Sequence, residues 1–116
     1  MAGVQECREA IDRLAGRLAE VDPEHRRAHL MDRTVSCRVT DLDTMFRMRL
    51  HEAGLTDIRL AEPADAEPPA QVRISLRSDD LVALADERLD LARSWLTGRV
   101  KLEASLGDLL RLRRLL

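Results

Sequence analysis

Aromatic side chains are nearly absent from this chain of 116 residues, which has one tryptophan (Trp95), one phenylalanine (Phe46) and no tyrosine. Proteins that bind single-stranded nucleic acid stack the bases on several aromatic rings, so this scarcity argues against that class. The net charge of −2 gives no global electrostatic basis for contacting a phosphate backbone either. We therefore expect no nucleic acid partner and a core of aliphatic side chains and methionine.

Cysteine is also scarce, with Cys7 and Cys37 in the contexts Glu-Cys-Arg and Ser-Cys-Arg. Neither context has the spacing of a metal site such as C-x-x-C. We expect two free, partly buried thiols in a cytoplasmic protein, with a disulfide between them as the alternative. A signal peptide is not recognisable, and no stretch of 18 apolar residues is present, so the sequence predicts no membrane span.

Motifs that carry catalysis or bind metal are missing as well. There is no G-x-S-x-G and no P-loop. His25 and His29 are four residues apart and could face one metal, but two arginines lie between them and no third ligand is evident. His51 falls on the polar side of a predicted strand without an evident partner, and Asp79 and Asp80 are explained by a position at the start of a helix. We therefore expect no catalytic residue, no metal and no cofactor.

Charged residues make up 34% of the chain and apolar residues 45%, which indicates one folded domain over residues 1–116. Apolar residues at spacings of three and four predict a helix over residues 4–18, and a second, short helix follows from Asp22 to about Leu30. Alternating apolar and polar residues predict strands with one buried face. These strands cover residues 35–39, 46–51, 58–60 and 72–77. A proline-containing surface loop spans residues 61–70.

The last third of the chain returns to helices. Ser78 is the predicted cap of a helix whose apolar face holds Leu81, Leu84 and Ala85. Asp90 can cap a further helix that carries Leu91, Trp95 and Leu96 and stops at Gly98. A fifth strand covers residues 99–103. The predicted order is α-α-β-β-β-β-α-α-β-α, an α+β fold with a mainly antiparallel five-stranded sheet and helices on one face.

The final eleven residues form a leucine-rich helix. At 100° per residue the six leucines of residues 106–116 spread over roughly 220°, and within that arc only Arg113 interrupts them. A surface helix needs an apolar stripe of about 100° or somewhat more. The surplus predicts a second apolar neighbour, which could be a cavity, a lipid or another chain.

Basic residues concentrate on the polar positions of the strands or at the strand ends. They are Arg38, Arg47, Arg49, Arg59, Arg73, Arg77, Arg99 and Lys101. We expect a solvated sheet face that discourages edge pairing. The alternative is a surface that makes transient contact with anionic membranes or with an acidic partner.

Residues 72–116 resemble the sterol-carrier-protein-2-type lipid-binding domain, most of all its small stand-alone actinobacterial members. The resemblance rests on the strand Val-Arg-Ile-Ser-Leu, the following Ser-Asp-Asp, the segment Gly-Arg-Val-Lys-Leu-Glu at 98–103, and the terminal apolar helix. Over residues 1–71 it rests on the order of elements alone. The residue after Glu103 is Ala104, where the family usually has glycine, and the aromatics common along the family's tunnels are mostly aliphatic here.

This resemblance implies an apolar tunnel between the sheet and the helices, used for non-catalytic binding and intracellular transfer of fatty acids, acyl-CoA or sterol-like compounds. We expect the C-terminal helix to close the tunnel. Transfer of an apolar chain from water is worth roughly 0.8 kcal/mol for each buried CH₂, so no catalyst is required. The candidate pocket residues, taken from the inner sheet face and the facing helices, are Phe46, Met48, Ile74, Leu81, Leu84, Trp95, Leu102, Leu109, Leu110, Leu112 and Leu116.

A second hypothesis is a protein-interaction module. In that case the surplus leucine face of the C-terminal helix packs on another subunit or a partner. The sequence leaves both a monomer and a weak homodimer open.

Overall fold

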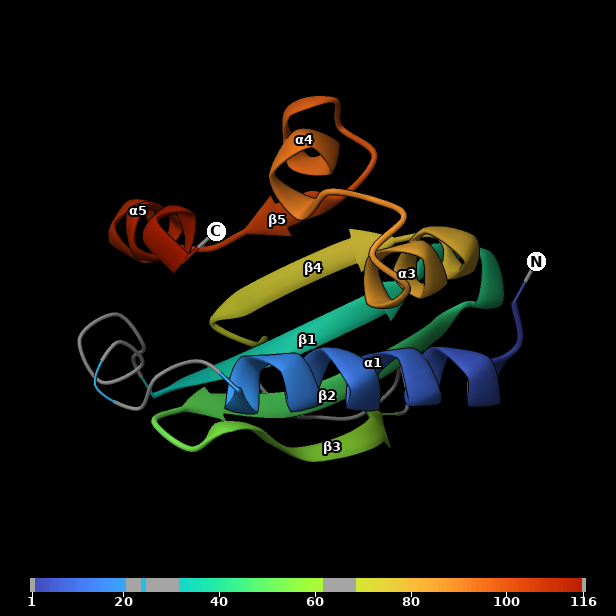
Figure 1. The fold of residues 1–116 in the computed structure, drawn as a ribbon, viewed down its shortest axis with the longest axis horizontal. Helices are drawn as coiled ribbons and strands as arrows, with labels where there is room; N and C mark the ends of the chain where they lie inside the picture. Colours follow the sequence, from blue (N-terminus) through green and yellow to red (C-terminus); the bar gives the residue numbers. More distant parts are fainter. Residues whose placement is uncertain (1, 21–23, 25–31, 62–68, 116) are drawn as a thin grey trace.

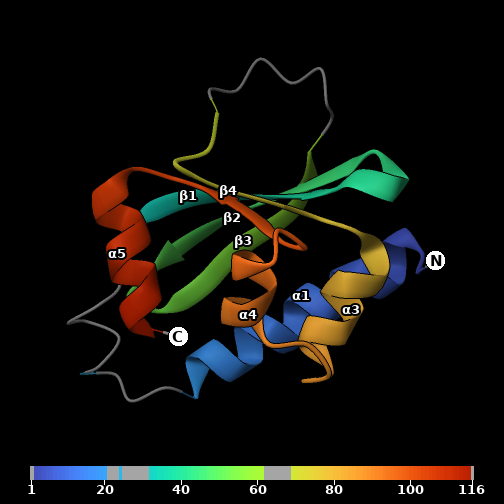
Figure 2. The ribbon, with the colours of Figure 1, turned by 90° about the horizontal axis from the view of Figure 1, so that it is seen from above.

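The computed structural model describes residues 2–20, 24, 32–61 and 69–115, which form one sheet with helices on one of its faces (Figures 1 and 2). In chain order the elements are α1 Val4–Ala19, β1 Arg33–Val39, the 3-10 helix η1 Thr40–Leu42, β2 Thr44–His51, β3 Gly54–Ala61, β4 Val72–Leu76, α3 Ser78–Ala85, α4 Leu91–Leu96, β5 Lys101–Glu103 and α5 Leu106–Leu115. The predicted α+β class is confirmed. The predicted short helix from Asp22 to about Leu30, apart from Glu24, and most of the proline-containing loop lie outside the described residues.

The sheet has the strand order β3-β2-β1-β4-β5. β1 and β4 pair in parallel, and the other neighbours pair antiparallel, so the expected mainly antiparallel sheet is confirmed. Each of the five paired residues of β1 faces the residue 37 positions later in β4, from Val35 opposite Val72 to Val39 opposite Leu76. Parallel strands cannot be joined by a tight turn, and here the β2–β3 meander lies between them in sequence.

Side chains fix the register of β1 and β4 at both ends. At the start, the Thr34 N–H donates to Gln71 Oε1 at 3.1 Å, and the Gln71 N–H donates to Thr34 Oγ1 at 3.0 Å. Just beyond the other end, the carboxylate of Asp41 in η1 accepts hydrogen bonds from the N–H of Ser78 at 2.7 Å and from its hydroxyl at 2.6 Å. The parallel pair is therefore tied by polar contacts before its first pair and after its last.

The contact between Asp41 and Ser78 corrects the prediction that Ser78 caps its own helix. The N-cap of α3 is Arg77, which makes no side-chain cap bond, and Ser78 is the first helical residue. Asp41, 37 residues earlier in the chain, accepts from both the backbone N–H and the hydroxyl of Ser78. Its carboxylate therefore binds the N-terminus of α3 in place of a capping side chain from the helix itself. Asp80 also does more than face the helix dipole, since it is buried and accepts a hydrogen bond from Arg99 at 2.9 Å.

The other predicted helix signals behave as expected, with one exception. Asp90 caps α4 by accepting from the Ala92 N–H at 3.0 Å, and Gly98 follows the helix with a φ of +79°. Leu96, predicted on the apolar face, is 87% exposed. α4 is only six residues long and buries Ser94 instead, so its last residue projects beyond the packed face.

Helices α1, α3 and α4 lie on one side of the sheet, and α5 lies at the end of the sheet at which β1 and β4 begin (Figures 1 and 2). α1 buries Cys7, Ala10 and Ile11 against the core. α5 is capped by Ser105, whose hydroxyl accepts from the Asp108 N–H, and it is tied to β1 by a 3.0 Å bond from Arg33 to the buried Asp108.

Acidic neighbours occupy several of the arginines expected on the outer sheet face. Arg49 binds Asp32, Arg73 approaches Glu103 at 3.4 Å and Arg38 approaches Asp43 at 3.7 Å. Arg47 and Arg59 also have interaction partners. Arg99, expected on the same face, pairs with Asp80 on the helix side. The outer face of the sheet, expected to be solvated, thus carries ion pairs between its arginines and neighbouring carboxylates.

We expect Asp41→Asn to lower stability at neutral pH and to weaken its dependence on acid. The hydrogen bonds from Ser78 hold the pKa of the Asp41 carboxyl below its usual value. A lowered folded-state pKa gives stability that is present above the unfolded-state pKa and is lost as the pH falls through the folded-state value. Denaturant unfolding between about pH 2 and pH 7 measures this.

The matched control is Asp43→Asn. Asp43 lies in the same connection with a φ of +47°, a conformation that asparagine tolerates, and it makes only the 3.7 Å contact with Arg38. An equal loss of stability in both variants would contradict a special role for Asp41.

Candidate functional site

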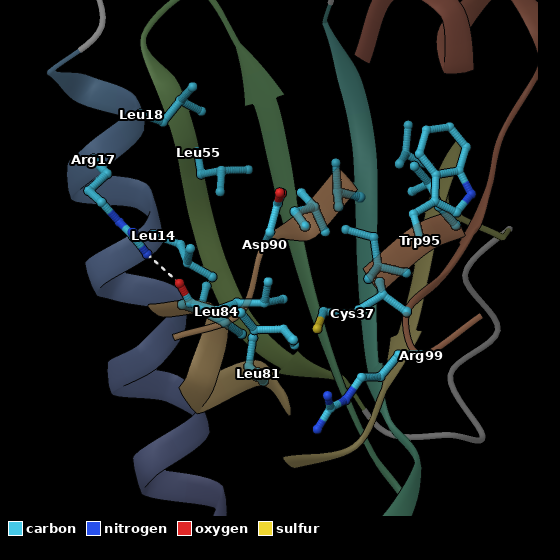
Figure 3. Close-up of a pocket in the computed structure, with 18 of the residues that line it drawn as sticks. Leu14, Arg17, Leu18, Cys37, Leu55, Leu81, Leu84, Asp90, Trp95 and Arg99 are labelled. Atoms are coloured by element: carbon cyan, nitrogen blue, oxygen red, sulfur yellow. Dashed lines mark hydrogen bonds between the residues drawn. The ribbon is translucent and has the colours of Figure 1, made fainter. Parts of the chain in front are cut away.

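A cavity of about 1010 Å³ lies between the sheet and the helices. Figure 3 shows that its wall is contributed by α1, by the sheet and by the segment from α3 to β5. The apolar lining residues are Ile11, Leu14, Leu18, Val35, Cys37, Met48, Leu50, Leu55, Val72, Ile74, Leu81, Leu84, Leu89, Leu91, Trp95, Val100 and Leu102. The volume is at the upper end of the about 300–1,000 Å³ usual for small-molecule pockets.

The wall is aliphatic because of the periodicity of its elements. Inward positions of β1, β2 and β4 recur every second residue, as in Val35 and Cys37 or Val72 and Ile74. Leu14 and Leu18 lie one turn apart on α1 and face this sheet across the cavity. Trp95 is the single aromatic side chain of the wall.

Charged side chains are confined to a few positions of the wall, and most of them have partners. Arg17 donates to the carbonyls of Leu84 at 2.8 Å and Ala85 at 3.0 Å at the C-terminal end of α3, and it also pairs with Glu87 at 3.1 Å. Figure 3 shows Arg17 reaching from α1 to this helix end. The contact closes one side of the cavity.

The remaining arginines of the wall are Arg88, Arg93 and Arg99. Arg88 pairs with Asp86 at 3.2 Å, and Arg99 with Asp80. Arg93 is exposed and has no ion pair within the described part of the chain. Four arginines and two carboxylates, Glu87 and Asp90, belong to the lining, so the charge of the wall is cationic on balance.

Both thiols are free, which confirms the expectation of unpaired cysteines. Burial, together with the nearby Cys7, raises the pKa of the Cys37 thiol to about 12. Burial likewise raises the pKa of Cys7, with contributions from Asp41, Glu6 and Asp79. Cys37 faces the cavity, yet at neutral pH it stays a neutral thiol and a poor nucleophile.

Six of the sequence-predicted pocket residues come together on this wall. They are Met48, Ile74, Leu81, Leu84, Trp95 and Leu102. Phe46 does not line the cavity, since it is fully buried in the core beside it. Leu109 is half-buried and Leu110 is 51% exposed, and both lie off the wall. The Leu112 side chain and Leu116 are outside the described residues.

Sequence reasoning missed the contribution of α1, from Ile11 to Leu18, and that of residues 87–91. The apolar stripe of α1 was visible as a pattern, but a stripe does not say whether it packs on side chains or borders a space. Residues 87–89 have no periodicity, and Asp90 and Leu91 indicated a helix cap and an apolar helix face without indicating a cavity.

Histidine and metal chemistry find no support among the described residues. No group of three histidine, cysteine or acidic side chains there could hold a metal ion. His51, predicted to lack a partner, has its Nε2 2.7 Å from the Thr56 hydroxyl across the β2–β3 hairpin. His25 and His29 lie outside the described residues. None of the helices found in the described ranges has the length and apolar content to cross a bilayer.

Comparison with known proteins identifies relatives of this architecture. The family model of the SCP-2 sterol transfer family matches residues 5–116. No curated protein sequence matches. A double mutant of the sec-alkyl sulfatase PisA1, an enzyme of a Pseudomonas species, is 27% identical with a TM-score of 0.61. The match covers 90% of this chain but 16% of the sulfatase, so the chain spans a small part of that protein.

Two similar structures from Aedes aegypti match over nearly their whole length. Sterol Carrier Protein 2 Like 2 is 15% identical, has a TM-score of 0.65 and is covered to 100%, with 98% of this chain matched. Sterol Carrier Protein-2 in complex with the C16 fatty acid palmitate is 15% identical, has a TM-score of 0.62 and is covered to 96%, with 99% of this chain matched. At this identity the two structures show a shared fold.

We expect both thiols to resist a thiol reagent such as Ellman's reagent in the native protein. With a pKa of about 12 instead of 9.0, Cys37 at pH 8 has roughly a thousandth of the thiolate of a free cysteine. Both thiols should react at once after denaturation in guanidinium, which serves as the control. Rapid, stoichiometric reaction of the native protein would contradict the buried placement.

Proposed function

This chain belongs to the SCP-2 sterol transfer family, and we propose that it binds a single-chain amphiphile with an anionic head group, such as a fatty acid. The apolar chain lies in the cavity between sheet and helices, and the head group lies at the arginine-bearing part of the wall. Binding and release, without chemical change of the ligand, is the function.

The observation that carries this proposal is the aliphatic cavity of about 1010 Å³. Methylenes leave water for such a space at roughly 0.8 kcal/mol each, and a chain of about ten of them supplies micromolar binding after the cost of association. Leu14, Leu81 and Met48 are flexible aliphatic side chains that can adjust to chains of different length.

The position of charge supports an anionic head group. Arg17 and Arg99 are engaged with protein acceptors. Arg93 of α4 is exposed and belongs to the lining of the cavity. A carboxylate placed there gains a charge-assisted hydrogen bond without displacing an existing pair. The acids of the lining, Glu87 and Asp90, already face Arg17 and the α4 amide of Ala92.

Two relatives support a ligand with an alkyl chain. One is described as a complex with palmitate, and the other is named a sec-alkyl sulfatase. Burial holds Cys37, the thiol of this wall, protonated, which argues against a nucleophilic mechanism through this side chain. We therefore favour binding over chemistry for this chain.

We also propose that α5 closes one end of the cavity. The helix lies at the end of the sheet where β1 and β4 begin (Figure 2), the same end that contributes Val35 and Val72 to the wall. The hydrogen bond from Arg33 to Asp108 ties α5 to the start of β1 and so holds the helix at this end.

Affinity should rise steeply with chain length. Trp95 is the only tryptophan and lines the cavity, so its fluorescence reports occupancy directly. In a titration of delipidated protein with saturated C10 to C16 fatty acids, we expect each added pair of methylenes to tighten binding about tenfold until the cavity is full. An affinity independent of chain length, or no change in Trp95 emission with any of these acids, would contradict the proposal.

A matched pair of variants on β3 locates the site. Leu55 lines the cavity, whereas Leu60 is 56% exposed and does not. Leu55→Phe should weaken binding of the longest acid about tenfold by removing space for the chain, and Leu60→Phe should bind like wild type. Equal effects of the two variants would place the ligand elsewhere.

The head-group contact is tested by Arg93→Gln. This change should weaken binding of a fatty acid about tenfold, the value of one charge-assisted hydrogen bond, but leave binding of the fatty alcohol of equal length unchanged. Arg38→Gln, whose arginine contacts only Asp43 at 3.7 Å on the outer face, is the control. Equal losses for acid and alcohol would exclude Arg93 as the head-group contact.

A further inference from the structure

Helix α5 carries an exposed face that its own fold does not cover. Leu106 is 74% exposed and Leu110 is 51% exposed, although leucine is usually buried. The two lie four residues apart and therefore on one side of the helix. The inward side is occupied by the buried Asp108 and the half-buried Leu109.

Exposed arginines flank this leucine face on both sides. At 100° per residue, Arg113 lies about 20° from Leu106 on one side, and Arg111 lies about 100° from Leu110 on the other. Both arginines are exposed. The one acid of the helix, Asp108, is turned inward and neutralised by Arg33. The outward surface of α5 is thus apolar in its middle and cationic at its borders.

We propose that this surface, Leu106 and Leu110 with Arg111 and Arg113, docks on an anionic lipid bilayer. A helix that lies in a membrane interface places leucines below the head groups and basic side chains at the level of the phosphates. Anionic lipid surfaces attract juxtaposed arginines, and the attraction is screened by salt.

A second copy of the chain is a poorer occupant of the same surface. In a two-fold dimer the same patch meets itself, so Arg111 and Arg113 of the two copies would be brought close together. Like charges placed against each other oppose association. A bilayer instead offers negative charge at the borders and hydrocarbon at the centre.

The outer sheet face, the other cationic surface of the molecule, is a weaker candidate for the same partner. Its arginines Arg49, Arg73 and Arg38 already have carboxylates beside them. On α5, by contrast, no carboxylate of the helix itself is on the exposed side among the described residues.

Docking through α5 has a direct consequence for exchange, which rests on the function proposed above. The helix lies at the end of the sheet where β1 and β4 begin (Figure 2), and Val35 and Val72 of those strands line the cavity. If α5 closes the cavity as proposed above, a bilayer bound to its outer side is adjacent to that opening, and the ligand can pass between cavity and bilayer without crossing bulk water.

Flotation of the full chain with vesicles tests docking without any ligand. We expect binding to vesicles of phosphatidylcholine with about a third phosphatidylglycerol at low salt, loss of binding at high salt and no binding to phosphatidylcholine alone. Arg111→Gln with Arg113→Gln should weaken partitioning roughly thirtyfold, about fivefold for each arginine, and Leu106→Gln with Leu110→Gln about tenfold or more. Because all four side chains are exposed, the variants should keep the far-ultraviolet circular dichroism of wild type.

The control variants are Arg38→Gln with Arg8→Gln and, separately, Leu60→Gln, which remove equivalent exposed groups elsewhere. Equal loss of binding in the controls, or binding independent of lipid charge, would overturn the proposal. So would sedimentation showing a wild-type dimer that Leu106→Gln with Leu110→Gln converts to a monomer, since a second copy would then cover the surface. Ligand transfer measured separately distinguishes the two proposals, because vesicle binding without fatty-acid binding would refute only the proposed function.

Discussion

The cavity depends on a helix of eight residues, α3, being held above the sheet. So short a helix is marginal by itself, and three polar contacts from distant parts of the chain fix its position. Asp41 holds its first residue, Arg99 binds Asp80 in its first turn, and Arg17 binds the carbonyls at its end. Leu81 and Leu84, which project from α3 into the cavity, are placed by these contacts together with the packing of α3 on α1.

These contacts also show which features the sequence could reveal. Alternation predicted the strands and helical spacing predicted α1, because each pattern is local. The cap of α4 was predictable for the same reason, since Asp90 acts on an amide two residues away. The partner of Ser78 could not be found this way, because Asp41 becomes its neighbour only through the parallel pairing of β1 and β4.

Long-range contacts also determine which residues of the candidate site could be predicted from the sequence. The sheet side of the wall followed from strand alternation, whereas the α1 side required knowing what α1 faces. Arg99 was placed on the outer face as a polar position of an alternating strand, yet the three-residue β5 begins only at Lys101, and Arg99 turns toward α3. Leu109 and Leu110 of α5 were expected in the cavity but lie off its wall, because surplus apolar surface does not by itself show what covers it.

The polar contacts at both ends of the β1–β4 pair determine which side chains of these strands face the cavity. Side chains alternate between the two faces of a strand, so a slip of one residue would turn Val72 and Ile74 outward and bring Arg73 and Ser75 in. Such a slip would separate Thr34 from Gln71 and Asp41 from Ser78 at the same time. A misregistered chain would therefore lose polar contacts at both ends of the strand pair as well as its lipophilic interior. Hydrogen bonds outside the cavity thus select the strand register that makes its wall apolar.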